Sequence, residues 1–290
     1  MRFAPSPPDH LSPEYRGKEK ILVVAGKCDS LTFSSAPHYT SPHEPFPNSI
    51  NRFPVLVDLV DGLFDLGLFF HCNIGDTMQL VSVQIGKPQT YDDLTATHVK
   101  EKQWTTAIFK TRTTELVNVT SLGIDGDGVA DHKHHGGIDK AVLAYSGDRY
   151  AYWKDKLQPK QIDVGGFGEN LTITGWDEST VCIGDQFEIG TTILEVSQPR
   201  EPCRTLARRW QEKMLPKYVA QCGYTGWYLR VLRAGQLKTG DQVSLVQRPN
   251  PSWSVQRANN VLYGRIIDAT VATELYLLPE LSAAWKKSLG

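Results

Sequence analysis

The stretch DQFEIGTTILEVSQ, residues 185–198, consists of two short runs rich in apolar and β-branched residues on either side of Gly190. In the first run Phe187 and Ile189 alternate with polar residues, which is the period of a half-buried strand. Glycine tolerates the backbone conformations that a tight turn requires. The stretch therefore predicts a hairpin of two antiparallel strands that turns at Gly190.

Short runs of this kind recur along the chain from residue 78, each bounded by Gly, Asp or Pro. They are MQLVSVQIGKPQ (78–89), TELVNVTSLGI (114–124), DKAVLAYS (139–146), ENLTITG (169–175) and DQVSLVQR (241–248). Many short strands at close intervals are typical of a closed barrel or a sandwich. Among them GDRYAYWKDKL (147–157) has helical spacing, because Tyr150, Trp153 and Leu157 share one face.

After RPNPSWS (248–254) the sequence becomes helical in character. We predict three short helices: one capped by Ser254 and closed by Gly264, one capped by Asp268 and stopped before Pro279, and one with Lys286 and Lys287 in its last turn. The expected fold is mainly β with α, of the α+β class. It comprises a β domain over residues 78–248 and a small three-helix domain over residues 251–290.

Residues 1–77 differ from the rest of the chain. They hold nine of the 17 prolines, and prolines at this density interrupt helices and central strands. We expect a poorly ordered extension or a mis-assigned start, with Met78 as the natural first residue. The longest apolar stretch, VLVDLVDGLFDLGLFF (55–70), carries three aspartates and is too short to span a bilayer comfortably.

The composition excludes several classes of protein. The formal net charge is −1, so no whole-chain field attracts a nucleic acid polymer or an anionic membrane. The five cysteines are widely spaced and form no CxxC pair, which argues against a disulfide scaffold or a zinc ribbon. This pattern is typical of a reducing compartment, and we expect a cytoplasmic protein.

The loop PREPCRTLARRW (199–210) follows the hairpin and contains one cysteine among four arginines. Nearby cations lower the pKa of a thiol, and the resulting thiolate is both a nucleophile and a soft metal ligand. Arginine also offers a two-pronged donor to phosphate or carboxylate. Cys203 is thus a candidate functional residue. The alternative is a buried structural cysteine beside a basic helix, which is the role that we expect for Cys182 and Cys222.

Two glycine-rich loops are further candidates, with ordinary turns as the alternative for both. In ADHKHHGGIDK (130–140) the three histidines have a spacing that rarely directs three rings at one ion, so we do not expect a zinc site. The preceding DGDGVADH (125–132) lacks the glycine and glutamate of a calcium loop. GGFGENLT (165–172) is no dinucleotide fingerprint, and we expect its backbone N–H groups to face a pocket.

Four segments together carry a resemblance to a known family. They are ADHKHHGGIDKAVLAYSGDRYAYW, GGFGENLTITGWDESTVCIGDQFEIG, LEVSQPREPCRTL and TGWYLRVLRAGQLKTGDQVSLV. They resemble the MOSC domain, which is named for the C-terminus of molybdenum cofactor sulfurases, and its YiiM subtype with a three-helix C-terminal domain. The resemblance runs from Met78 to Gly290 and leaves out residues 1–77.

The resemblance implies a barrel-like fold that binds a molybdenum cofactor of the molybdopterin type. It implies Cys203 as catalytic residue and molybdenum ligand, and His135 as a hydrogen-bonding residue of the pocket wall. The residues that we expect to hold the cofactor are Lys110, His135, Gly136, Gly137, Lys140, Gly168, Glu169, Asn170, Arg200 and Arg204. The implied reaction is R–NHOH + 2e⁻ + 2H⁺ → R–NH₂ + H₂O on N-hydroxylated compounds such as 6-hydroxylaminopurine.

The electrons are expected from a partner reductase, because this sequence has no flavin or iron–sulfur motif. Two alternatives stay open, as does the oligomeric state. MOSC modules also occur joined to pyridoxal-phosphate-dependent sulfurases, so Cys203 could carry a persulfide. The protein could also store or carry the cofactor without catalysis.

Overall fold

A computed structural model describes residues 78–92, 102–158 and 160–289. All of these belong to one compact unit of the chain. The expectations for residues 1–77, including the start at Met78, lie outside the described residues.

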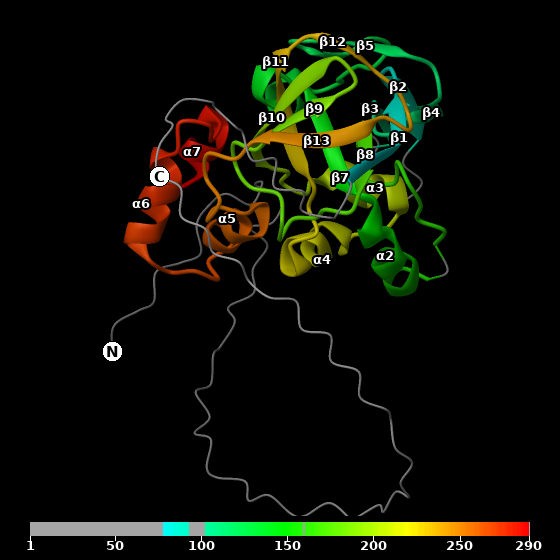
Figure 1. The fold of residues 1–290 in the computed structure, drawn as a ribbon. Helices are drawn as coiled ribbons and strands as arrows, with labels where there is room; N and C mark the ends of the chain where they lie inside the picture. Colours follow the sequence, from blue (N-terminus) through cyan, green and yellow to red (C-terminus); the bar gives the residue numbers. More distant parts are fainter. Residues whose placement is uncertain (1–77, 93–101, 159, 290) are drawn as a thin grey trace, which may run out of the picture. The chain divides into compact units, whose positions relative to one another are not determined.

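Seven strands form a closed barrel (Figure 1). They are β1 (Met78–Ile85), β7 (Val142–Ser146), β8 (Leu171–Thr174), β9 (Gln186–Ile189), β10 (Thr192–Pro199), β11 (Trp227–Arg233) and β13 (Gln242–Gln247). Their order is β13-β9-β10-β11-β7-β8-β1, and β1 closes the ring by pairing antiparallel with β13. Only β7 and β8 pair in parallel among these neighbours. Closure leaves few free sheet edges.

Shorter strands extend this barrel. β4 (Thr111–Thr113) pairs with β1. β12 (Gly235–Leu237), β5 (Val117–Thr120) and β6 (Gly123–Ile124) form a three-stranded sheet, and β2 (Gln89–Asp92) pairs with β3 (Gln103–Thr106). The predicted strands are thus present in the described residues.

The hairpin predicted at residues 185–198 is confirmed as the antiparallel pair β9 and β10. Ile189 pairs with Thr192, which leaves Gly190 and Thr191 as the turn. Gly190 has a φ of +57°, and a Cβ added there would lie 2.2 Å from the carbonyl oxygen of Gln236. Only glycine fits this position without a shift of the backbone.

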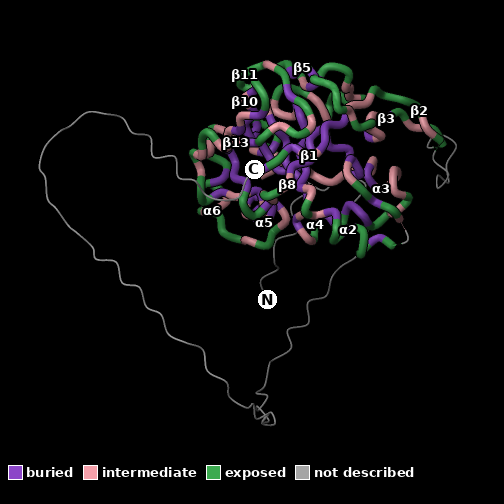
Figure 2. The backbone as a smooth tube through the Cα atoms, turned by 45° about the vertical axis from the view of Figure 1, so that its right-hand side comes forward, coloured by how far each residue is buried: buried purple, intermediate pink, exposed green. Residues whose placement is uncertain are grey.

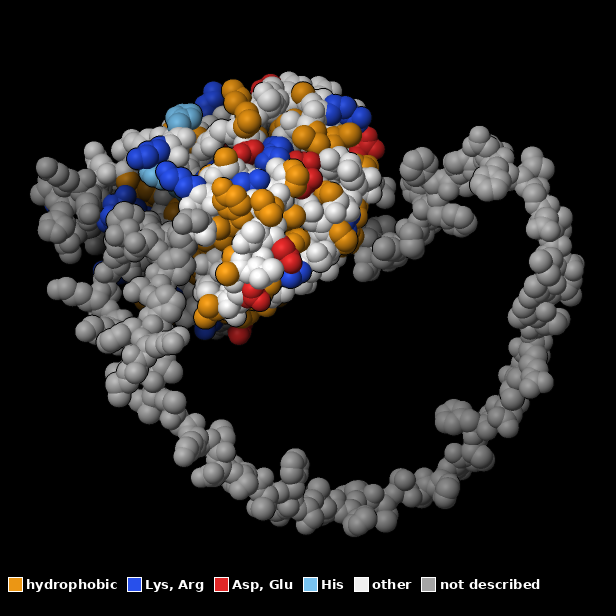
Figure 3. All heavy atoms as spheres, turned by 90° about the vertical axis from the view of Figure 1, so that its left-hand side faces the viewer, with side chains coloured by type: hydrophobic (Ala, Val, Ile, Leu, Met, Phe, Trp, Pro, Cys, Tyr) orange, Lys and Arg blue, Asp and Glu red, His pale blue; other side chains and the backbone are white. Residues whose placement is uncertain are grey.

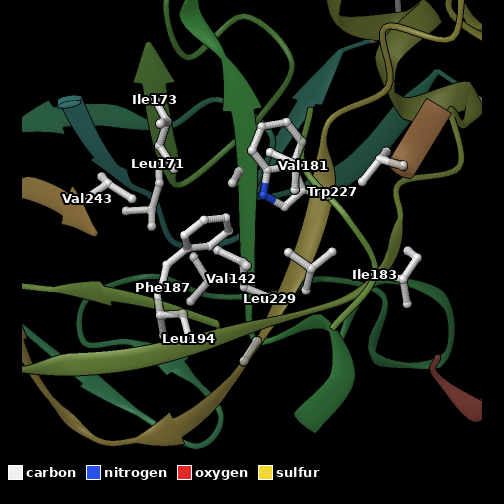
Figure 4. Packing of buried hydrophobic residues seen from close by; sticks show 14 of the residues in the cluster. Val142, Leu171, Ile173, Val181, Ile183, Phe187, Leu194, Trp227, Leu229 and Val243 are labelled. Atoms are coloured by element: carbon white, nitrogen blue, oxygen red, sulfur yellow. The ribbon is translucent and has the colours of Figure 1, made fainter. Parts of the chain in front are cut away.

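The barrel interior is filled by apolar side chains from alternating strand positions. Phe187, Leu194, Trp227 and Leu229 are each at most 1% exposed, and Figure 4 shows them converging with residues of neighbouring strands. Figure 2 shows the buried residues concentrated along the strands, while the helices carry exposed residues on their outer sides.

Seven α-helices lie in the described residues. They are α1 (His132–His135), α2 (Tyr150–Lys156), α3 (Arg204–Trp210), α4 (Leu215–Cys222), α5 (Val255–Leu262), α6 (Ala269–Leu277) and α7 (Ala283–Leu289). The helical face predicted on α2 is confirmed: Tyr150, Trp153 and Leu157 are buried in a second core cluster that also includes Tyr145 and Phe167. None of the described helices is long and apolar enough to cross a membrane.

The first two of the three C-terminal helices begin at the predicted caps. The side chain of Ser254 accepts a hydrogen bond from the N–H of Arg257, and that of Asp268 accepts from Thr270. These helices pack against β10, where the Ser282 hydroxyl donates to the Gln198 side-chain oxygen at 2.6 Å. The fold is therefore the expected α+β arrangement of a β-barrel with a helical C-terminal region.

Candidate functional site

A cavity with about 710 Å³ of open space, including its mouth, lies at one end of β10 and β11. Its lining combines segments that are far apart in the sequence, from Thr105 to Tyr228. Seven of the residues predicted for the site line it: Lys110, His135, Lys140, Gly168, Asn170, Arg200 and Cys203.

Cys203 is placed by the end of the hairpin. β10 ends at Pro199, and the N–H of Arg200 donates to the carbonyl oxygen of Gly226 at 3.1 Å, which ties the loop to the start of β11. Cys203 is then the N-cap residue of α3, with an extended backbone. The predicted loop therefore holds its cysteine between a fixed strand and a helix.

The environment of Cys203 favours the thiolate. Burial by itself raises the pKa of this thiol, but the hydrogen bond from His135, the charge of Arg200 and the hydrogen bond from Thr205 outweigh it and lower the pKa from 9.0 to about 6. Cys182 shows the opposite case, because burial raises its pKa to about 11. The thiolate therefore predominates at neutral pH at Cys203 and not at Cys182.

Arg200 is the buried cation of the cavity. It is 3% exposed, and its Nη1 has no hydrogen-bond partner among the described residues. A buried donor without a partner costs about 1–3 kcal/mol. Because Arg200 lines the cavity beside Cys203, an anionic group that enters the cavity would satisfy this donor and gain a charge-assisted hydrogen bond.

Lys110 is not an unpaired cation, because its ammonium group contacts the carboxylate of Asp127. Burial lowers the pKa of Lys110, and the charge of Asp127 opposes that effect. Asn170 donates to the other oxygen of Asp127 at 2.8 Å, so a lysine, a carboxylate and an amide form one connected wall. Sequence reasoning missed Asp127, since the stretch around it was considered only as a calcium loop.

Lys140 is half-buried and also lines the cavity. Its Nζ donates to the carbonyl oxygen of His134 at 2.8 Å and lies 5.8 Å from the centre of the Tyr228 ring. Burial lowers the pKa of Lys140, while the charge of Glu201 acts in the opposite direction. The ammonium group of Lys140 can therefore still attract an anion that enters the cavity.

Four of the predicted residues do not line the cavity: Gly136, Gly137, Glu169 and Arg204. The two glycines connect α1 to the short helix Ile138–Lys140, and Gly137 has a φ of +98°, which favours glycine. Arg204 is the first residue of α3. Gly136, Gly137 and Arg204 therefore belong to the segments that carry His135, Lys140 and Cys203.

The expected open N–H groups of the loop at residues 165–168 are not available to a ligand. The buried carboxylate of Glu169 accepts from the N–H groups of Gly165 at 2.7 Å and Phe167 at 3.1 Å, and from the Tyr150 hydroxyl at 2.5 Å. The N–H of Gly166 donates to Tyr150 in turn. The expectation was wrong because the loop closes on its own carboxylate, so Glu169 holds the loop and Gly168 lines the cavity.

Two of the three histidines of α1 contact different partners. His134 contacts Asp131 through Nδ1 at 2.7 Å, whereas His135 forms a hydrogen bond with the Cys203 side chain. Within the described ranges no group of three or more His, Cys, Asp or Glu residues could hold a metal ion.

Family models match two parts of the chain. The MOSC domain matches residues 131–244, and the YiiM-like 3-alpha helix domain matches residues 253–290. YflK of Bacillus subtilis is 37% identical over 72% of this chain and 91% of its own length. YiiM of Escherichia coli is 31% identical over 63% of this chain and 82% of its own.

A protein of Gibberella moniliformis named Reductase is 37% identical over 60% of this chain, but the match spans only 32% of that protein. Among solved structures, YiiM from Geobacillus stearothermophilus aligns with a TM-score of 0.61 and 33% identity, over 73% of this chain and 97% of that one. YiiM from Escherichia coli aligns with a TM-score of 0.56 and 28% identity, over 62% and 86%.

Proposed function

The chain belongs to the YiiM-like family of MOSC-domain proteins, and from this premise we propose that it binds a molybdenum cofactor and reduces N-hydroxylated compounds such as 6-hydroxylaminopurine. One relative is named a reductase. The observation that carries the proposal is the combination, in one cavity, of the Cys203 thiolate and the buried Arg200 donor that has no partner among the described residues.

The residues of the cavity fit a molybdenum–pterin group. Molybdenum takes soft thiolate ligands, which Cys203 offers at neutral pH. The phosphate of the pterin would meet Arg200, with Lys140 as a second cation.

When bound, the cofactor would supply the two-electron chemistry of R–NHOH + 2e⁻ + 2H⁺ → R–NH₂ + H₂O. The protein side chains have separate tasks. His135 keeps a hydrogen bond on the Cys203 sulfur and so maintains the thiolate. The pair of Lys110 and Asp127, held by Asn170, presents fixed donors and acceptors that can orient a polar ring in the cavity.

Sulfur transfer is the second candidate function, and the low pKa of Cys203 also favours it. A thiolate at neutral pH is a nucleophile that can carry a persulfide. This role predicts a labile sulfur on Cys203 and no bound molybdenum.

Metal content distinguishes the two functions. We would purify the chain anaerobically from a host that makes the cofactor and measure molybdenum by elemental mass spectrometry in the wild type, Cys203→Ala and the control Cys222→Ala. We expect near-stoichiometric metal in the wild type and the control, and loss in Cys203→Ala. Metal-free protein throughout, with a labile sulfur on Cys203, would replace the proposal by sulfur transfer.

A further inference from the structure

The rim of the cavity carries a short basic segment. Asp131 and His135 both line the cavity, so the residues between them, on α1, lie at its mouth. These are His132, Lys133 and His134, and all three are exposed. We call residues 132–134 the α1 surface.

Three acidic groups lie near the α1 surface, and each faces a partner: Glu201 faces the charge of Lys140, and the other two are Asp131 and Asp139. Asp131 accepts from the N–H groups of Lys133 and His134 and contacts the His134 ring. Asp139 contacts Arg230 at 2.9 Å. Lys133 has no ion pair among the described residues, so its charge faces solvent uncompensated.

A further cation lies close to this surface, because the ammonium group of Lys140 donates to the backbone carbonyl oxygen of His134. Figure 3 shows pale-blue histidine side chains on this face, and the described ranges hold no histidines other than His132, His134 and His135. Lys and Arg side chains border them there, while Asp and Glu side chains lie further along the face.

This surface borders the cavity in which the proposed reaction would consume electrons. The sequence has no flavin or iron–sulfur motif, so the electrons must arrive from another molecule. Basic and acidic patches that face each other speed association and fix orientation.

We propose that the α1 surface docks an acidic electron-carrier protein at the mouth of the cavity. The role of this docking rests on the proposed function, whereas the binding itself does not. With a one-electron carrier D, the balanced reaction is R–NHOH + 2 D(reduced) + 2 H⁺ → R–NH₂ + H₂O + 2 D(oxidised). Each turnover thus oxidises two carriers, and the oxygen leaves as water.

Binding is measured first, with oxidised flavodoxin as the acidic carrier and the full chain on a calorimeter. The variants are Lys133→Glu and the matched control Lys217→Glu, an exposed lysine on α4 that does not line the cavity. At about 10 mM salt, where screening is weak, we expect Lys133→Glu to raise the Kd at least about tenfold and Lys217→Glu to leave it unchanged. The difference should disappear at about 300 mM salt.

Turnover separates this inference from the proposed function. With cofactor-loaded protein, Lys133→Glu should slow reduction of 6-hydroxylaminopurine by reduced flavodoxin about as much as it raises the Kd. Reduction by dithionite-reduced methyl viologen should be unaffected, because this small cation needs no docking surface. No viologen-driven reduction in the wild type would remove the proposed function and leave the binding result standing. Equal Kd values for the two variants, or no flavodoxin binding at low salt, would overturn the docking proposal.

Discussion

At the scale of single residues, the chemistry of the site could be predicted where it follows from neighbours in the chain. Cys203 stands among arginines in the sequence, and the fold keeps the charge of Arg200 beside it. Glu169 was misplaced because its carboxylate accepts from the N–H groups of the loop that precedes it, a closure that the sequence does not reveal. Gly168 and Asn170 line the cavity, and the side chain between them turns to the loop behind. Asp127 was missed because its partner Lys110 is 17 positions away.

The reactivity of Cys203 should follow its lowered pKa. We expect alkylation by iodoacetamide to rise with pH around a midpoint of about 6 at Cys203, and the peptide that contains this residue can be followed by mass spectrometry. Arg200→Gln should move the midpoint upward, since removing a nearby cation disfavours the thiolate. Arg200→Lys keeps the charge and should restore most of the shift. A midpoint that is the same in all three proteins would show that Arg200 does not control this thiol.

At the scale of elements, alternation and turn residues were sufficient to predict the hairpin β9–β10, the first strand and the helix caps at Ser254 and Asp268. These features depend on local spacing and on backbone conformations that few residues tolerate. The pairing order of the barrel could not be predicted in this way, because contacts such as β1 with β13 join segments at opposite ends of the domain. The connection at residues 165–168 is the clearest case, since a buried carboxylate organises it.

The loop at residues 165–168 should depend on the charge of Glu169. In the wild type the N–H groups of Gly165 and Phe167 donate to the two carboxylate oxygens of Glu169, and Glu169→Gln replaces one of these oxygens by an N–H₂ group. Because two donors then face each other in a buried place, we expect a loss of about 2–4 kcal/mol in the free energy of unfolding. Urea denaturation measures this loss. Glu188→Gln, on the half-exposed pair with Arg233, should cost less than about 1 kcal/mol. Similar losses for both variants would contradict the role assigned to Glu169.

At the scale of the described unit, the C-terminal helices and the barrel share one core. Trp285 of α7 and Leu275 of α6 belong to the same buried cluster as Val196 of β10. The Ser282 N–H also donates to the carbonyl oxygen of Ser197 at 2.9 Å. β10 continues into the loop of Cys203, so the helices support the strand from which the site is built. The sequence predicted the three helices of residues 251–290 but not this shared core, because periodicity shows which face is apolar and not what covers it.

This shared core predicts that the barrel and the three helices unfold together. Trp285 is fully buried, and Trp285→Ala should cost about 3–5 kcal/mol through the cavity it leaves. The helical signal at 222 nm and the fluorescence of the remaining tryptophans, which include Trp227 in the barrel, should then shift to lower denaturant by the same amount. Leu277→Ala, at a position 67% exposed on α6, should shift neither signal by more than about 0.5 kcal/mol. If Trp285→Ala moved only part of the helical signal and left the tryptophan fluorescence transition in place, the three helices would be an independent folding unit, and the strand that leads to Cys203 would not depend on them.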